Sequence, residues 1–290
     1  MEKGSSNIDK LRSYANIFTN STFERLIRSD DFSHIQARIK KYDNGFIRNG
    51  RRTYREYFSH SYKALIAHYR NEYIYKNFII EQILIGKYSL KTTNGLNEFR
   101  INKSIADLVL VNGTSKVFEI KTELDNPNRL ANQINDYKKV FKEIYIVTHH
   151  SLEHKYNEII SNDIGLIVLT SNNTLKTIRE PLVNDNLDSI TMMKCLRKFE
   201  YSNIILSYYG SIPNSSDFKF YSTCKVLFEK IPIYDLHYLM INELKKRTIK
   251  EKDILVSKIV PKELKHICMC LNFNKEEYKK LDKLLSEIIL

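Results

Sequence analysis

The sequence predicts an α/β protein in which helices flank a mixed β-sheet and an all-α C-terminal region follows. Apolar residues recur at helical spacing over residues 61–86, and three short strand-like runs follow each other within residues 98–121. Two further apolar runs, at 143–148 and 165–170, each come after a helical pattern. The low counts of 8 glycines and 5 prolines in 290 residues favour long regular elements with short connections.

The first predicted helix, SYKALIAHYRNEYIYKNFIIEQILIG, ends at Gly86 and begins the predicted core domain, residues 61–180. Residues 1–60 are polar and basic with short helical patches, which predicts an N-terminal helical extension. From about residue 185 to 290 the pattern is helical, and prolines at 213, 232 and 261 separate the expected helices.

The core elements should alternate in the order α-β-β-β-α-β-α-β, a β-meander followed by right-handed crossovers. After the first helix, the expected elements are strands Glu98–Ile101, Ile105–Val111 and Lys116–Lys121, a helix from Asn128 to about Phe141, a strand at 143–148, a helix at 151–161 and a strand at 165–170.

The charge balance favours an anionic partner. Lysine and arginine number 46 against 34 acidic residues, a net charge of +12, and nucleic acid is the usual partner of such a protein. A general bias of the composition toward Lys, Asn, Ile and Tyr is the alternative explanation. No apolar run approaches the length of a membrane span and the N-terminus lacks a signal-peptide core, so we expect a cytoplasmic protein with no membrane partner.

The cysteines are Cys195, Cys224, Cys268 and Cys270, and none forms the C-x-x-C pair typical of zinc or iron–sulfur sites. The pattern His266-x-Cys268-x-Cys270 contains metal-ligand types. Its apolar helical surroundings, KHICMCLNF, instead favour reduced thiols in a core.

A predicted hairpin, SIADLVLVNGTSKVFEIKTEL, carries acidic and basic residues in otherwise apolar strands. A three-residue loop, residues 112–114, would place Asp107 opposite Glu119, and Lys121 would share the face of Glu119 because side chains two apart in a strand point the same way. A two-residue turn would shift the register by one and separate these groups.

These three groups have the chemistry of a metal site. Neighbouring carboxylates repel each other unless a cation or a proton lies between them. Oxygen ligands suit Mg²⁺ or Mn²⁺, and a nearby lysine can orient an attacking water or stabilise charge on a phosphate. We therefore expect Asp107 and Glu119 to bind a divalent cation beside Lys121.

The pattern Asp107, eleven residues, Glu119-x-Lys121 resembles the PD-(D/E)xK nuclease superfamily, whose restriction-endonuclease-like core has a similar order of elements. In the next helix, NRLANQINDYKKVF, the pair Gln133-x-x-x-Tyr137 is similar to the QxxxY motif of the RecB-type branch.

The spacing of this pair places Gln133 and Tyr137 on one helix face with Arg129 one turn earlier. Such a stripe could contact phosphates and stack on a base. The alternative is an ordinary exposed helix face with Tyr137 half buried.

The resemblance implies a Mg²⁺- or Mn²⁺-dependent nuclease that hydrolyses phosphodiester bonds, in DNA rather than RNA. It implies metal ligation by Asp107, Glu119 and the backbone carbonyl of Ile120, with Lys121 positioning the water. An acid on the preceding helix would support the metal, and Glu72 is preferred over Glu81 because it lies among apolar neighbours.

The resemblance extends over residues 61–170. It is to a group of stand-alone PD-(D/E)xK-like proteins of bacteria and mobile elements, whose genes tend to travel with phage-defence or conjugative elements. Ala106 stands where the namesake proline would be. The absence of a C-x-x-C cluster argues against the iron–sulfur version, and no G-x-x-x-x-G-K-[ST] motif indicates a fused motor.

Residues 38–57, RIKKYDNGFIRNGRRTYREY, mix basic and aromatic side chains, which predicts a nucleic-acid-contact arm that includes Arg51 and Arg52. A solvated face is the alternative.

Two other functions stay open. The same fold could serve as a catalytically silent nucleic-acid or protein adaptor, with the C-terminal helices docking a protein partner. The nuclease could also stay silent until a partner or phage signal releases it. An oligomer is compatible with either.

Overall fold

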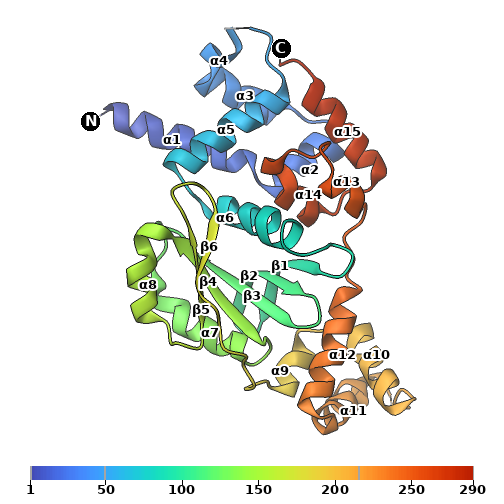
Figure 1. Ribbon diagram of the computed structural model, residues 1–290. Coiled ribbons are helices and arrows are strands. Elements are labelled where there is room, and N and C mark those ends of the chain that lie inside the picture. The colour runs from blue at the N-terminus through green and yellow to red at the C-terminus, as the bar shows by residue number, and fades with distance from the viewer. Residues whose placement is uncertain (1, 49, 215, 290) are drawn as a thin grey trace. The chain divides into compact units, whose positions relative to one another are not determined.

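The computed structural model describes residues 2–48, 50–214 and 216–289, with the backbone alone for 2–6 and 217, and it forms two compact units (Figure 1). The first unit consists of residues 1–86 and 249–290, and the second of residues 87–248. These boundaries differ from the three consecutive domains expected from the sequence, because the last helices of the chain pack with the first ones.

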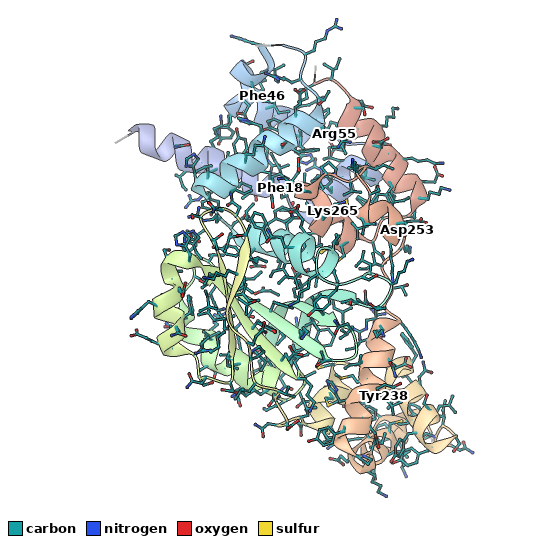
Figure 2. All side chains as sticks on the ribbon, in the orientation of Figure 1. Phe18, Phe46, Arg55, Tyr238, Asp253 and Lys265 are labelled. Carbon is teal, nitrogen blue, oxygen red and sulfur yellow. The ribbon has the colours of Figure 1, made fainter. Side chains whose placement is uncertain are left out.

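The first unit is helical. Its elements are α1 (Glu2–Ile17), α2 (Asn20–Arg28), α3 (Ser33–Tyr42), α4 (Asn44–Arg48), α5 (Tyr54–His68), α6 (Glu72–Phe78), the π-helix η1 (Ile79–Ile85), α13 (Lys252–Val256), the 3₁₀ turn η4 (Lys262–Leu264), α14 (Lys265–Leu271) and α15 (Lys275–Ser286). Helix α15 contacts α5 and α2, and α14 contacts α2 and α6, so chain segments far apart in sequence share one core. Phe18 lies in this core (Figure 2). Its ring stacks on that of Tyr73, with the ring centroids 5.1 Å apart.

The single helix expected over residues 61–86 is instead two helical segments. Helix α5 begins earlier, at Tyr54, because Thr53 and Glu56 form a capping box there. The helix stops at His68, where Tyr69 leaves helical geometry (φ −155°, ψ 71°), and α6 begins after Asn71. Apolar spacing continues across the break, so periodicity could not reveal it. The predicted end at Gly86 is confirmed.

The second unit contains a six-stranded sheet in the order β1-β2-β3-β4-β5-β6. Strands β1 to β3 form an antiparallel meander, β3, β4 and β5 are parallel, and β6 pairs antiparallel with β5. The strands are β1 (Asn94–Ile101), β2 (Ser104–Val111), β3 (Ser115–Lys121), β4 (Glu143–His149), β5 (Gly165–Leu169) and β6 (Leu175–Arg179). The mixed sheet and its five predicted strands are confirmed, although β1 begins at Asn94 and not at Glu98. Strand β6 was not expected because its sequence, LKTIR, is short and has few apolar residues.

Two helical segments lie between the parallel strands, as predicted. They are η2 (Pro127–Arg129) leading into α7 (Leu130–Lys138), and η3 (His150–Leu152) leading into α8 (Glu153–Ile159). Helix α7 contacts β2 and β4, and α8 contacts β5 (Figure 1). They bury one face of the sheet, with Val109, Val117 and Ile146 in its core.

The helical region expected after residue 185 is confirmed. Within the second unit it comprises α9 (Ser189–Lys194), α10 (Lys198–Tyr209), α11 (Asp217–Lys230) and α12 (Ile233–Lys245). Helix α12 contacts β2 and is anchored by a buried hydrogen bond between His237 Nε2 and Ser115 Oγ, 2.8 Å apart.

In the described ranges, no helix combines the length and the apolar character needed to cross a membrane.

Candidate active site

The β2–β3 hairpin has the register that the three-residue loop predicts. Val111 pairs with Ser115 and Leu108 with Phe118, so continuing the same count places Asp107 opposite Glu119. Gly113, at the tip, has a φ of +113°, a conformation that a residue with a side chain would adopt only with strain.

Glu119 and Lys121 point to the same face of the sheet and form a buried ion pair. Lys121 Nζ lies 2.6 Å from Glu119 Oε1, and the two residues are 8% and 2% exposed. An ion pair removed from water persists only when further hydrogen bonds satisfy both partners. Those bonds come from α7.

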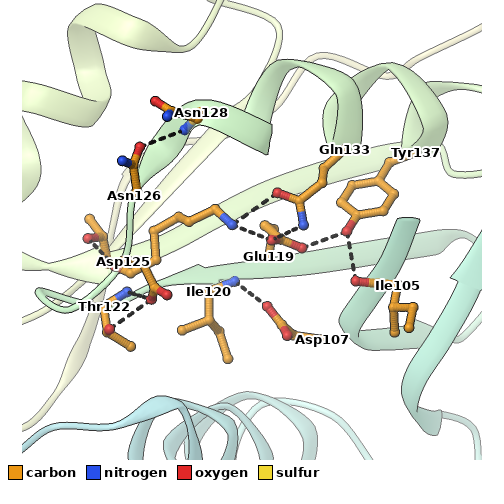
Figure 3. A network of polar contacts seen from close by, with 12 residues as sticks. Ile105, Asp107, Glu119, Ile120, Thr122, Asp125, Asn126, Asn128, Gln133 and Tyr137 are labelled. Atoms are coloured by element: carbon orange, nitrogen blue, oxygen red, sulfur yellow. Dashed lines mark hydrogen bonds and ion pairs between the residues drawn. The ribbon is translucent and has the colours of Figure 1, made fainter. Parts of the chain in front are cut away.

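Gln133 and Tyr137 of α7 supply the remaining hydrogen bonds to this pair (Figure 3). Gln133 Nε2 donates to Glu119 Oε1 at 2.6 Å, and Gln133 Oε1 accepts from Lys121 Nζ at 3.0 Å. The Tyr137 hydroxyl donates to Glu119 Oε2 at 2.6 Å and lies 3.1 Å from the carbonyl oxygen of Ile105. These four side chains, Glu119, Lys121, Gln133 and Tyr137, are called the Glu119 cluster below.

Tyr137 supports the carboxylate and does not face solvent. Its ring is fully buried. Burial, then the charge of Glu119 and the hydrogen bond to it, raise the pKa of Tyr137 well above its usual value, so the hydroxyl stays protonated and donates. A ring in this position cannot stack on a base, which corrects the function expected for Tyr137 from its spacing alone.

At Asp107 the alternation of side chains between the two faces of the sheet is interrupted along β2. Ala106 and Val109 belong to the same buried cluster although they are three apart, which strict alternation forbids. Across the ladder from Asp107, Glu98 of β1 has a left-handed backbone (φ +50°). The Asp107 carboxylate points between the strands and accepts the Ile120 backbone N–H at 2.7 Å (Figure 3).

The expectation that all three groups share one face therefore holds for Glu119 and Lys121, while Asp107 is turned toward the main chain of β3. The two carboxylates lie opposite each other in the register; Asp107 accepts the Ile120 N–H, and Glu119 accepts from Lys121, Gln133 and Tyr137.

Magnesium or manganese binding by Asp107 and Glu119 stays a prediction. Mg²⁺ retains several waters and is commonly bound through one or two carboxylates plus substrate phosphate, which Asp107 and Glu119 could supply. Across the described parts of the chain, no group of three or more His, Cys, Asp or Glu is arranged to hold a metal ion. Ile120 contacts Asp107 through its backbone N–H, and the metal ligation expected of its carbonyl stays a prediction.

A pocket of about 950 Å³ adjoins the Glu119 cluster. The turn between β1 and β2 forms one wall and α7 the other, and Gln133 is shared by the pocket and the cluster. Its lining residues are Asn102, Lys103, Ser104, Ile105, Arg129, Asn132, Gln133, Asn135 and Asp136. Sequence reasoning identified Arg129 and Gln133 and missed the turn residues, although the polar Asn102-Lys103 pair between two strands was a signal of a hairpin tip.

Comparison with known proteins assigns a family. The model of the family described as Bacteriophage P4 protein cII matches residues 66–285, which include the Glu119 cluster and the pocket. The chain belongs to the bacteriophage P4 protein cII family.

One curated relative in this family is protein cII of Enterobacteria phage P4, which is 27% identical over 146 residues. That match covers 49% of this chain and 54% of the relative, so it spans about half the length of each. Among solved structures, the SPO1766 protein of unknown function from Silicibacter pomeroyi matches with a TM-score of 0.32 and 12% identity, over 49% of this chain and 92% of the other. The resemblance to PD-(D/E)xK nucleases stays a prediction.

In this cII-family member, the acid expected on the preceding helix is not turned inward. Glu72 belongs to the first unit, its side chain is 54% exposed, and its carboxylate pairs with the buried ammonium of Lys76 at 2.5 Å. Lys76 is therefore the buried member of this pair, and Glu72 lies at the surface although apolar residues follow it in the sequence. The alternative, Glu81, is half buried, and burial raises its pKa. Metal ligation by either acid stays a prediction.

The basic segment at residues 38–57 is only partly available for nucleic acid. Tyr54 and Tyr57 are buried, and the Tyr57 hydroxyl donates to Asp43, so neither ring is a stacking platform. Arg51 is exposed. Arg52 pairs with Glu56 at 3.0 Å and lies over the Phe46 ring, so its charge is largely balanced within the first unit. Nucleic-acid binding by Arg51 and Arg52 stays a prediction.

The four cysteines of this family member are free thiols, as expected. Cys268 is buried in α14, and Cys270 Sγ lies 3.3 Å from His266 Nε2, one helical turn away. Burial lowers the pKa of His266 to about 3, so its ring is neutral at physiological pH.

Proposed function

We propose that this member of the cII family is a Mg²⁺- or Mn²⁺-dependent nuclease that hydrolyses phosphodiester bonds, in DNA rather than RNA. The observation that carries the proposal is the Glu119 cluster. Two motifs recognised separately, Glu119-x-Lys121 on a strand and Gln133-x-x-x-Tyr137 on a helix, meet in one hydrogen-bonded group beside a pocket. Their contact is the support for reading the two motifs as one site.

The side chains of the cluster have distinct functions in this proposal. Gln133 and Tyr137 hold Glu119 in one orientation, and a fixed orientation is what a catalytic carboxylate requires. Lys121 carries a positive charge in a water-poor site, where it can stabilise charge that develops on a phosphate or orient the attacking water. A divalent cation bound by Asp107 and Glu119 would supply Lewis-acid activation of the phosphate and of water.

Cleavage of labelled single- and double-stranded DNA in Mn²⁺ tests this proposal. We expect Glu119→Gln, which keeps the shape and most hydrogen bonds of the cluster, to lower the cleavage rate at least 100-fold, and Asp107→Ala and Lys121→Ala to abolish cleavage. Circular dichroism would verify that each variant is folded. Lys176→Ala, an exposed residue of β6, removes a charge elsewhere in the same unit and should cleave like the parent. Variants as active as the parent would refute the assignment.

A non-catalytic adaptor is the second candidate function, and one observation favours it. Three protein donors already occupy the Glu119 carboxylate, so a cation would compete with them. Calorimetric titration with Mn²⁺ discriminates the two: the enzyme should bind the ion and lose it in the Asp107→Ala variant, whereas the adaptor should show no binding. Binding of Mn²⁺ without cleavage would indicate a nuclease that needs a partner or a phage signal.

We place this activity in the cytoplasm and in the biology of mobile elements, with phage defence as one setting. The support is the family, since its curated relative is a protein of phage P4. The C-terminal helices of this chain would dock a protein partner in this proposal.

A further inference from the structure

The β1–β2 turn, which forms one wall of the pocket beside the Glu119 cluster, is hydrogen-bonded to α7, which forms the other. Asp136 of α7 fastens the β1–β2 turn to the helix, accepting the Asn102 side-chain amide at 3.1 Å and the Ser104 hydroxyl at 2.7 Å. Asn102 adopts a left-handed backbone (φ +51°), which asparagine tolerates better than most residues, and this makes a two-residue turn between Ile101 and Ser104. The wall that carries Lys103 is thereby held against α7.

The lining of this pocket has the chemistry of a nucleotide site. Lys103 and Arg129 are exposed cations on opposite walls, suited to phosphate. Asn132 and Asn135 offer side-chain amides, which can donate to and accept from a base edge. Ile105 is 42% exposed, an apolar surface for a sugar or a base. The acid in the pocket, Asp136, accepts from two neutral donors and keeps its negative charge, which the two cations Lys103 and Arg129 outnumber.

Size and position point to a single strand. The volume of about 950 Å³ lies at the upper end of the range, roughly 300–1,000 Å³, of small-ligand pockets. A base can enter such a pocket only when it is unstacked, as in a single strand. Gln133 lines the pocket and bonds both Glu119 and Lys121, so a nucleotide bound there lies next to the proposed catalytic groups.

We propose that this pocket binds one nucleotide of single-stranded DNA, with Lys103 and Arg129 on its phosphates and Asn132 and Asn135 on its base. The position of this nucleotide beside a scissile bond rests on the proposed nuclease function, but its binding requires neither metal nor cleavage.

Fluorescence anisotropy with a labelled ten-nucleotide single-stranded DNA, in EDTA at low salt, tests the pocket. The Lys103→Ala/Arg129→Ala double variant should bind at least tenfold more weakly than the parent. Its plot of log affinity against log salt concentration should be shallower by about one unit per lost phosphate contact. Asn132→Ala/Asn135→Ala, which removes no charge, should weaken binding several-fold and leave the salt dependence unchanged.

A charge-matched control separates the pocket from general attraction by a basic protein. Lys155→Ala/Lys176→Ala removes two exposed charges from the same unit at positions outside the pocket, and it should bind like the parent. Equal losses in the two charge-removing variants would overturn the pocket assignment, as would a parent that does not bind the DNA. Tighter binding of duplex DNA or of single-stranded RNA would overturn the assignment to single-stranded DNA.

Failure of the pocket and failure of the nuclease are distinguishable. If the parent binds DNA through the pocket but neither binds Mn²⁺ nor cleaves, the nuclease proposal fails and the pocket stands. If the parent cleaves while the pocket variants bind like the parent, the pocket proposal fails and the nuclease stands.

Discussion

The ammonium group of Lys121 lies 2.6 Å from a carboxylate oxygen of Glu119, two residues earlier on the same strand, and both side chains are almost fully buried. Gln133 contacts both members of this pair, and Tyr137 contacts the acid. Removing any one of these four side chains would therefore leave a buried hydrogen-bonding partner unsatisfied.

Removing the lysine should destabilise the second unit. Lys121→Met leaves the Glu119 carboxylate buried without its counter-charge, and breaking a buried pair from one side costs about 3–5 kcal/mol. Urea unfolding followed by circular dichroism measures the change. The Lys121→Met/Glu119→Gln double variant should recover part of the loss because no unpaired charge remains. A single variant as stable as the parent would mean that water or another cation satisfies Glu119.

Removing the hydroxyl of Tyr137 should cost less and still be measurable. Tyr137→Phe keeps the buried ring and deletes the donor to Glu119 Oε2, and hydrogen bonds to charged groups contribute about 1.5–3 kcal/mol. Tyr208→Phe is the matched control, because that ring is 41% exposed on α10 and should change stability by less than about 0.5 kcal/mol. If both substitutions have the same small effect, Tyr137 is not the donor that orients Glu119.

Acid should weaken the contact between α12 and the sheet through His237. Burial, then the charge of Lys142, lower the pKa of His237 to about 4, below the value of about 6.5 expected in the unfolded chain. Between these values the unfolded state binds a proton that the folded state does not, so stability falls as the pH falls below 6.5.

Between pH 7 and pH 5 the free energy of unfolding should fall by about 2 kcal/mol from this histidine. His237→Gln keeps a polar partner for Ser115 and cannot titrate, so it should lose less stability over the same interval, as measured by urea unfolding at each pH. Parallel pH profiles of the parent and this variant would contradict the assignment. His266, buried with a pKa of about 3, contributes acid sensitivity to both proteins equally.

The thiols should react slowly with disulfide reagents in the native protein. Burial raises the pKa of Cys195 to about 12 and raises that of Cys268 further, and the thiolate is the reactive form. Cys224 is also fully buried. We expect four reactive thiols per chain after denaturation in guanidinium and slow reaction of Cys195, Cys224 and Cys268 before it. Rapid native reaction of Cys268 would indicate that α14 opens readily.

Local signals predicted the hairpin because they act between neighbouring residues. Alternating apolar residues and an Asn112-Gly113-Thr114 loop suffice to determine a register, and the register places Asp107 opposite Glu119. The same local signals missed β6, whose polar sequence is a strand only because β5 offers an unpaired edge.

The sequence by itself determined the order of the first five strands along the chain, because each has its own apolar pattern. It also determined the face shared by Glu119 and Lys121 and the helix face shared by Gln133 and Tyr137, since these depend on residue spacing within one element. Only the tertiary structure decided that Tyr137 is buried against Glu119, that Asp107 turns toward the Ile120 backbone, and that the chain's first and last helices share a unit. Burial and side-chain partners come from segments far apart in the sequence, and spacing within one segment carries no information about them.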